Sequence, residues 1–171
     1  MTKTALLAIL ILVGAVTAAA AESTGLGPGD KVRIVVFGEE DLSGEFELDG
    51  KGVFSMPLIG PVDGNVTGPR DLEARIAAML RDGYLTNPKV SIEVLTYRPV
   101  YVLGEVNAPG SYPYKTGMTV LTAAAMAGGF TYRADEDEIE VSRGGSGPAK
   151  VMPADTVIRP GDIIRVHERF F

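Results

Sequence analysis

Residues 102–114, VLGEVNAPGSYPY, form the most patterned part of the chain. The run NAPG in its centre predicts a turn, because proline fixes φ and glycine allows conformations that other residues avoid. The runs on either side of the turn predict two strands. Residues 116–129, TGMTVLTAAAMAGG, then predict a short helix with Thr119 as its N-cap and the two final glycines as its end.

Three side chains of this segment are candidate contacts to a polymer or to a neighbouring subunit: Glu105, Asn107 and Tyr114. The glycines and the proline of the segment are explained by turn geometry. Glu105 and Asn107, in contrast, carry polar groups that the turn does not require. Tyrosine rings suit sugar rings, although tyrosines in strands also pack laterally, and Tyr112 is predicted to lie in the core because it follows the turn.

A Pro-Gly-Asp motif occurs twice, in LGPGDKVRIVVF (residues 26–37) and in RPGDIIRVHE (residues 159–168). In both copies, apolar residues stand two and four positions after the aspartate. The glycine suits a turn and the aspartate side chain can close it, so each copy predicts a tight corner that leads into a half-buried strand. The repeat is short and predicts similar corners rather than duplicated domains.

Between the two motifs, Asp49-Gly50 predicts a hairpin that joins two extended runs. Residues 68–84, GPRDLEARIAAMLRDGY, predict a helix that Gly68 caps and Pro69 begins. Its apolar residues fall on one face: Leu72, Ile76, Met79 and Leu80. Residues 87–97, NPKVSIEVLTY, predict a strand.

These elements predict an α+β protein of two small, closely packed sheet-and-helix domains, at residues 22–97 and 98–171. Residues 1–21 have the layout of a secretory signal peptide: a basic start, an apolar segment and small residues at Ala19 and Ala21. A membrane-spanning helix is the alternative, but it needs about 20 apolar residues, and this apolar segment is shorter.

The amino-acid composition limits the covalent modifications and the classes of partner that the chain can have. The chain has no cysteine, which excludes disulfides and a lipid on an amino-terminal cysteine. An exported protein of this kind is expected to be soluble and, in a bacterium, periplasmic. The net charge of -6 argues against a nucleic acid as a partner.

No pattern in the sequence predicts an enzyme, a metal site or a cofactor. His167 is the only histidine, and it falls on the solvated face of its predicted strand. The acidic run at residues 135–138, DEDE, lacks the spacing of a calcium loop and predicts a solvated loop before a strand. No pair of carboxylates is singled out for glycoside hydrolysis.

The order of these motifs resembles the bacterial outer-membrane polysaccharide export family. The first Pro-Gly-Asp strand, residues 41–68 (DLSGEFELDGKGVFSMPLIGPVDGNVTG), the helix and the strand that follows it resemble the polysaccharide export domain. Residues 102–135 resemble an SLBB domain (soluble-ligand-binding β-grasp).

The resemblance implies a non-catalytic, periplasmic subunit of a capsule or exopolysaccharide export apparatus, associated with the outer-membrane export complex. Implied partners are further copies in a ring around the polymer, an inner-membrane polysaccharide co-polymerase and a separate outer-membrane β-barrel protein. The last is expected because the chain lacks the lipidated cysteine and the carboxy-terminal amphipathic helix of larger members. A monomeric carbohydrate- or peptidoglycan-binding module is the alternative, and a polysaccharide-degrading enzyme ranks last.

Overall fold

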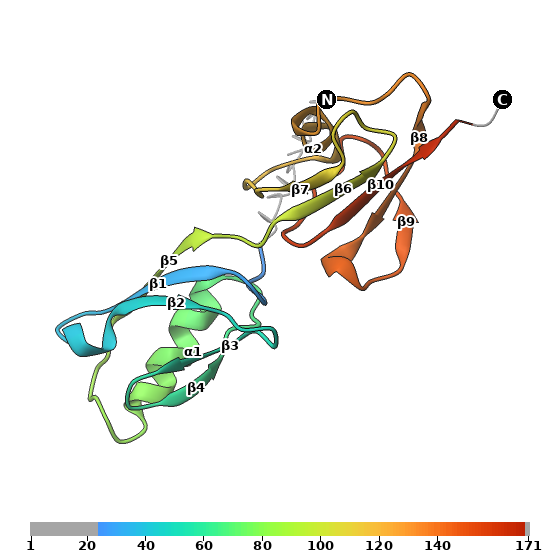
Figure 1. Cartoon of the computed structure of the whole chain (residues 1–171). Helices are drawn as coiled ribbons and strands as arrows, with labels where there is room; N and C mark the ends of the chain where they lie inside the picture. The colour runs from blue at the N-terminus through green and yellow to red at the C-terminus, as the bar shows by residue number, and fades with distance from the viewer. Residues whose placement is uncertain (1–23, 170–171) are drawn as a thin grey trace, which may run out of the picture.

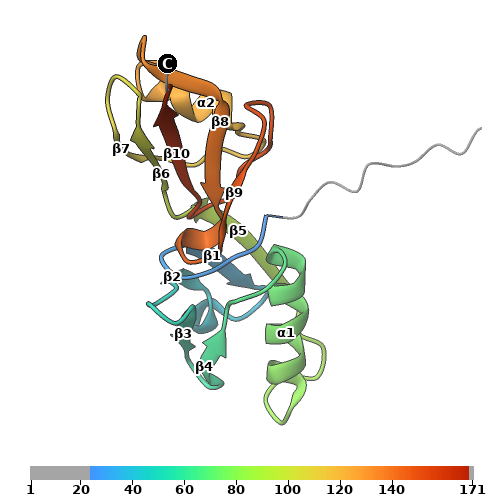
Figure 2. The same ribbon diagram turned by 90° about the vertical axis from the view of Figure 1, so that its right-hand side faces the viewer.

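A computed structural model describes residues 24–169, so the predicted signal peptide lies outside the described residues. The chain forms two bodies placed end to end, each with its own sheet and helix (Figures 1 and 2). Each body has a separate cluster of buried apolar side chains. The predicted α+β class is therefore confirmed. The two bodies are referred to below as the first half (β1 to β5) and the second half (β6 to β10).

The first half contains a three-stranded antiparallel sheet in the order β2-β1-β5, a two-stranded hairpin β3-β4 and one long helix. Its elements are β1 (Lys31–Val36), the 3₁₀ turn η1 (Glu40–Leu42), β2 (Gly44–Glu47), β3 (Val53–Met56), β4 (Gly60–Asp63), α1 (Pro69–Arg81) and β5 (Val90–Thr96). Strand β1 alternates as predicted, with Val32, Ile34 and Val36 buried against α1 and the hairpin.

Helix α1 begins where the sequence predicts and ends at Arg81, within the predicted residues 68–84. Gly68 is the N-cap and Pro69 is the first helical residue. The helix packs beside β5, and its buried residues are Leu72, Ile76, Ala77 and Leu80. A long amphipathic helix of this kind is readable from sequence because its burial follows the 3.6-residue period.

The predicted hairpin around Asp49-Gly50 is wrong in its pairing. The turn itself forms, and Oδ1 of Asp49 accepts hydrogen bonds from the backbone N–H groups of Lys51 and Val53. However, β2 pairs with β1, and β3 pairs with β4. The Asp-Gly pair therefore redirects the chain from one sheet to another, which a local turn signal does not distinguish from a hairpin.

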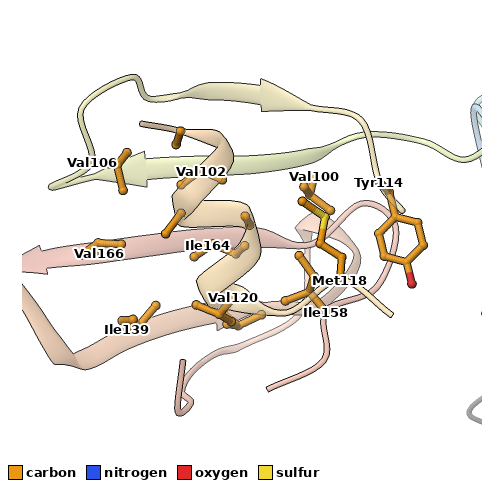
Figure 3. Close-up of a cluster of buried hydrophobic side chains, with 14 of the residues drawn as sticks. Val100, Val102, Val106, Tyr114, Met118, Val120, Ile139, Ile158, Ile164 and Val166 are labelled. Carbon is orange, nitrogen blue, oxygen red and sulfur yellow. The ribbon is translucent and has the colours of Figure 1, made fainter. Parts of the chain in front are cut away.

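The second half is a five-stranded mixed sheet in the order β7-β6-β10-β8-β9. Its elements are β6 (Val100–Gly104), β7 (Gly110–Tyr112), α2 (Val120–Met126), β8 (Ala134–Ser142), the 3₁₀ turn η2 (Arg143–Gly145), β9 (Ala149–Val151) and β10 (Ile163–Glu168). Strand β10 lies between β6, to which it is parallel, and β8, to which it is antiparallel. Helix α2 covers one face of this sheet over a core of valines and isoleucines (Figure 3).

In the second half, the predicted helix cap is confirmed, whereas the predicted loop at residues 135–138 is wrong. Thr119 caps α2 as predicted. Its side chain accepts a hydrogen bond from the backbone N–H of Thr122, and Oγ1 of Thr122 accepts one from the backbone N–H of Thr119. The acidic run was predicted in a loop, but β8 already begins at Ala134 and includes it. The run is nevertheless solvated, because residues 136–138 are exposed.

Candidate functional site

The two Pro-Gly-Asp corners are the most constrained polar sites in the described part of the chain. Asp30, in the first corner, is completely buried. Its Oδ2 accepts from the Gly27 backbone N–H at 2.9 Å and from Nη1 of Arg98 at 2.7 Å, and its Oδ1 accepts from the Arg98 backbone N–H at 2.6 Å. Asp30 therefore closes its own turn and also holds the segment that leaves β5.

The second corner repeats this arrangement with different residues. Asp162 is also completely buried. Its Oδ2 accepts from the Arg159 backbone N–H at 2.8 Å and from Nη1 of Arg143 at 2.6 Å, and its Oδ1 accepts from the Gly144 backbone N–H at 3.1 Å. In both corners a buried carboxylate thus receives two backbone N–H groups and one guanidinium group, which is how proteins stabilise a buried charge.

Sequence reasoning found the aspartates but missed both arginines. Asp30 and Arg98 are 68 positions apart, and Asp162 and Arg143 are 19 apart, so no local spacing connects them. The available signal was the repeated motif itself, because a buried aspartate needs a cationic or hydrogen-bonding partner. Arg98 is the first residue after the predicted domain boundary between residues 97 and 98.

Arg98 also joins the two halves, because it lies against glycines of both corners. A Cβ atom added to Gly27 would lie 3.0 Å from Nη1 of Arg98, and one added to Gly161 would lie 2.8 Å from its Nε. Tyr97, the residue before Arg98, packs against both hydrophobic cores. Its ring meets that of Tyr114 edge-on, with 5.5 Å between centroids. The two halves are therefore coupled by direct packing in addition to the connecting chain.

The electrostatics of the first corner reflect this burial. Burial raises the pKa of the Asp30 carboxyl above its ordinary value, and the hydrogen bond and charge of Arg98 partly offset the increase. Arg98 is thus the main cation that favours the ionised carboxylate.

Two hollows of about 500 Å³ each open beside the corners, and Arg159 lines both. The first lies between the halves and is lined by Gly25, Leu26, Val66, Thr67, Arg98, Arg159 and Pro160. The second is lined by Thr24, Tyr114, Thr116, Gly117, Arg143, Thr156, Val157 and Arg159. Together they are referred to as the junction cleft.

Glu105 and Asn107, two of the predicted contact residues, are the chain neighbours of Val106. Figure 3 shows Val106 at the opposite end of the buried cluster from Tyr114. Oε2 of Glu105 accepts from Oγ1 of Thr131 at 2.6 Å. Nδ2 of Asn107 donates to the Gly128 carbonyl oxygen at 2.7 Å. Both side chains therefore hold their loop against the turn after α2, and a role for them in contacts with a polymer or a subunit stays a prediction.

Tyr114, the third predicted residue, is 8% exposed and lies in the core, with an edge in the junction cleft. Tyr112, predicted as core, is only partly buried, and its hydroxyl donates to the Ala108 carbonyl oxygen. The alternation of the strand ends at Tyr112, the last residue of β7, so the strand pattern does not extend to Tyr114. The structure places Tyr114 apart from Glu105 and Asn107 rather than in one site.

The remaining ionisable groups form no metal site within residues 24–169, where no group of three histidine, aspartate or glutamate side chains could hold a metal ion. His167 lies opposite the buried Ile164 and Val166, but it is less solvated than predicted: its side chain is 34% exposed, and its Nε2 lies 3.1 Å from Oε2 of Glu140. None of the described helices is both long and apolar enough to cross a bilayer.

Comparison with known sequences matches each half of the chain to a protein family. The family described as "Polysaccharide biosynthesis/export protein" matches residues 18–95, and the SLBB domain family matches residues 99–153. The chain belongs to the polysaccharide export family. Its export domain is followed by one SLBB match, in the order that the sequence motifs predict.

Named relatives agree with this assignment. The chain is 35% identical over 149 residues to the exopolysaccharide production protein ExoF of Rhizobium meliloti, which covers 80% of this chain and 35% of ExoF. It is 31% identical to the polysialic acid transport protein KpsD of Escherichia coli, over 70% of this chain and 22% of KpsD. It is 32% identical to the EPS I polysaccharide export outer membrane protein EpsA of Ralstonia nicotianae, over 82% of this chain and 40% of EpsA. The chain thus spans less than half the length of each of these relatives.

Proposed function

We propose that this polysaccharide export protein is a non-catalytic, periplasmic subunit that forms part of a ring-like conduit for an exopolysaccharide or capsule polymer. Its role in polysaccharide export is shared with relatives named for production, transport and export of such polymers. A ring-like conduit is a more specific proposal than a role in export. The proposed subunit comprises an export domain at residues 22–97 and an SLBB domain at residues 98–171, behind a cleaved signal peptide.

The observation that carries the proposal is the coupling of the two halves at the junction. The Asp30–Arg98 pair is shielded, because Asp30 is 0% and Arg98 23% exposed in their side chains, and Tyr97 packs against both cores. A wall around a moving polymer needs subunits that keep their shape while they bind the polymer weakly. Two halves fixed by a buried ion pair and a shared aromatic contact suit that requirement.

The proposed partners are further copies of this chain, an inner-membrane polysaccharide co-polymerase, a separate outer-membrane β-barrel protein and the polymer itself. Ring assembly requires contacts that repeat around an axis, and such contacts join two different surfaces of the subunit. A conduit of this kind accelerates no reaction, so the proposed mechanism is assembly and containment.

Native mass measurement of residues 22–171 tests the proposal, first alone and then with the soluble region of the co-polymerase. The expected result is a closed oligomer of defined copy number, either alone or on the co-polymerase. A protein that stays monomeric and does not bind the co-polymerase would refute the conduit role. If that monomer binds neutral oligosaccharides saturably, the alternative of a carbohydrate-binding module replaces it.

A further inference from the structure

Helix α2 is exposed on one side, although its sequence, VLTAAAM, contains no charged residue. The outward side of α2 is formed by Leu121, Thr122, Ala125 and Met126. Leu121 is 52% exposed and Met126 is 39% exposed. A helix that is apolar on all sides is typical of a buried position. Helix α1 is different, because its exposed side carries charged residues, Arg70 and Arg81 among them. The outward side of α2 therefore has the character of a surface that another element covers.

The sheet face that α2 does not cover also exposes apolar side chains. Strand side chains alternate between the two faces of a sheet, so Tyr101 and Leu103 lie on the face opposite the buried valines of β6. The register of β6, β10, β8 and β9 adds three more apolar residues to this uncovered sheet face: Ala149, Val151 and Ile163. The first sheet differs again, because its exposed face carries ion pairs of Lys31 and Arg33 with three glutamates.

These two surfaces lie on opposite sides of one body. Helix α2 lies over one face of the sheet (Figure 1), and the core of the second half fills the space between helix and sheet (Figure 3). The outward side of α2 and the uncovered sheet face therefore point in opposite directions. A contact between like faces of two copies would cover one of these surfaces and leave the other exposed. A head-to-tail contact covers both, because each copy offers its helix to one neighbour and its sheet to the other.

A helix face and a sheet face are suitable partners for each other. Protein cores are built from layers in which apolar helix and sheet faces pack together, and a sheet can carry helices on both of its faces. The small side chains of Thr122 and Ala125 let a sheet approach α2 closely. A polysaccharide is a poorer partner for these surfaces, because its hydroxyl groups would lose water against leucine, methionine and valine side chains without gaining hydrogen bonds.

The two surfaces also carry charges of opposite sign. Asp155 is exposed in the segment whose backbone carbonyl groups accept from the first turn of α2. Arg165 is exposed on β10, the central strand of the uncovered sheet face. Neither side chain makes an ion pair within residues 24–169. Glu140, the cross-strand neighbour of Arg165, instead lies 3.1 Å from Nε2 of His167. Opposite charges favour contact between the two surfaces and disfavour contact of either surface with itself.

We propose that α2 of one copy packs on the uncovered sheet face of the next copy, so that each sheet lies between its own α2 and that of a neighbour. This inference rests on the proposed function, which requires copies of the chain to assemble, and it adds the two surfaces that meet. A head-to-tail contact of this kind repeats from copy to copy, and it closes into a ring when the rotation between copies returns to the start.

Cysteine cross-linking tests the contact, because the chain has no cysteine of its own. The double variant Ala125→Cys/Leu103→Cys of residues 22–171 is treated with a short bis-maleimide linker, alone and with the soluble region of the co-polymerase. The expected result is a ladder of cross-linked copies, whereas each single cysteine variant gives no cross-linked dimer. The matched control is Ala74→Cys/Leu103→Cys, which moves one cysteine to an exposed alanine of α1 and should give no ladder.

Two lysine substitutions test whether these surfaces hold the assembly. Ala125→Lys places a cation on the outward side of α2, and Leu103→Lys places one on the uncovered sheet face. Each is expected to weaken assembly at least about tenfold in native mass measurements, because the added charge loses water when the surfaces meet. Ala74→Lys, on the exposed side of α1, is the matched control and should assemble like the wild type. Far-UV circular dichroism checks that each variant is folded.

The outcomes separate this inference from the proposed function. A closed oligomer whose double cysteine variant gives no ladder would overturn the inference and leave the conduit role standing. A dimer from Leu103→Cys alone or from Ala125→Cys alone would show that like faces meet, which also overturns it. If Ala125→Lys abolishes co-polymerase binding but leaves the oligomer intact, α2 binds the co-polymerase and the inference falls. A ladder from open filaments would have the opposite meaning, because the contact would hold while the closed conduit would not.

Discussion

Replacing Arg98 with alanine removes the guanidinium group from a carboxylate that has no access to water. Asp30 is 0% exposed and its side-chain ion pair with Arg98 is 2.7 Å long. Removing one partner of a buried pair costs about 3–5 kcal/mol, because the remaining charge is left uncompensated. Two backbone N–H groups still reach Asp30 in the variant. We therefore expect a loss near the lower limit, about 3 kcal/mol in the free energy of unfolding.

Urea unfolding at neutral pH, followed by far-UV circular dichroism, measures this loss. Arg33→Ala is the matched control, because Arg33 pairs with Glu45 and Glu93 on the exposed face of the first sheet. Exposed pairs contribute only about 0–1 kcal/mol. If Arg98→Ala costs no more than Arg33→Ala, the junction is not held by the buried pair. The double variant Asp30→Asn/Arg98→Met should lose less than the sum of its single variants, because the two side chains interact directly.

Three further predictions concern local structure. Gly104→Ala should lower stability by at least about 1–3 kcal/mol, because Gly104 has φ of +86° and an added Cβ would overlap the Val166 carbonyl oxygen; equal thermal melting of variant and wild type would contradict this. Thr119→Ala should cost about 1 kcal/mol by urea unfolding, since it removes the acceptor for the Thr122 N–H, whereas Thr119→Ser should be nearly neutral. Backbone hydrogen bonds lower the pKa of Asp49 below 3.8, so its stabilising effect is present above that pH and is lost as the pH falls through the lowered pKa. Asp49→Asn should therefore flatten the acid side of the stability profile, and an unchanged profile would refute the assignment.

Local patterns predicted much of the fold. Helix α1 was readable because its caps and its apolar period lie within one continuous segment. The corner before β1 was readable because Pro-Gly-Asp specifies a turn and the strand after it alternates. The pairing of β2 with β1 rather than β3 was not readable, because strand partners are chosen by contacts far apart in sequence. The start of β8 was misplaced for the same reason, since its pairing with β10 draws charged residues into the strand.

The candidate site was less predictable than the fold. The aspartates of the two corners could be recognised, but the arginines that neutralise them come from separate segments. Glu105 and Asn107 were chosen for their unassigned polar groups, and the structure gives both groups partners within the chain. A sequence indicates which side chains need partners, whereas only the folded chain shows whether those partners are internal.

The position of β10 constrains the order in which the second half can fold. This strand is near the carboxyl end of the chain but lies in the middle of its sheet, between β6 and β8. Until residues 163–168 arrive, β6 and β8 have no strand between them. Closing the sheet then brings together segments about 60 positions apart, Val102 and Ile164 among them, and such distant contacts form slowly. During synthesis, the first half can complete its sheet while the second half waits for its final strand. In that interval the unpaired strands of the second half are exposed to aggregation.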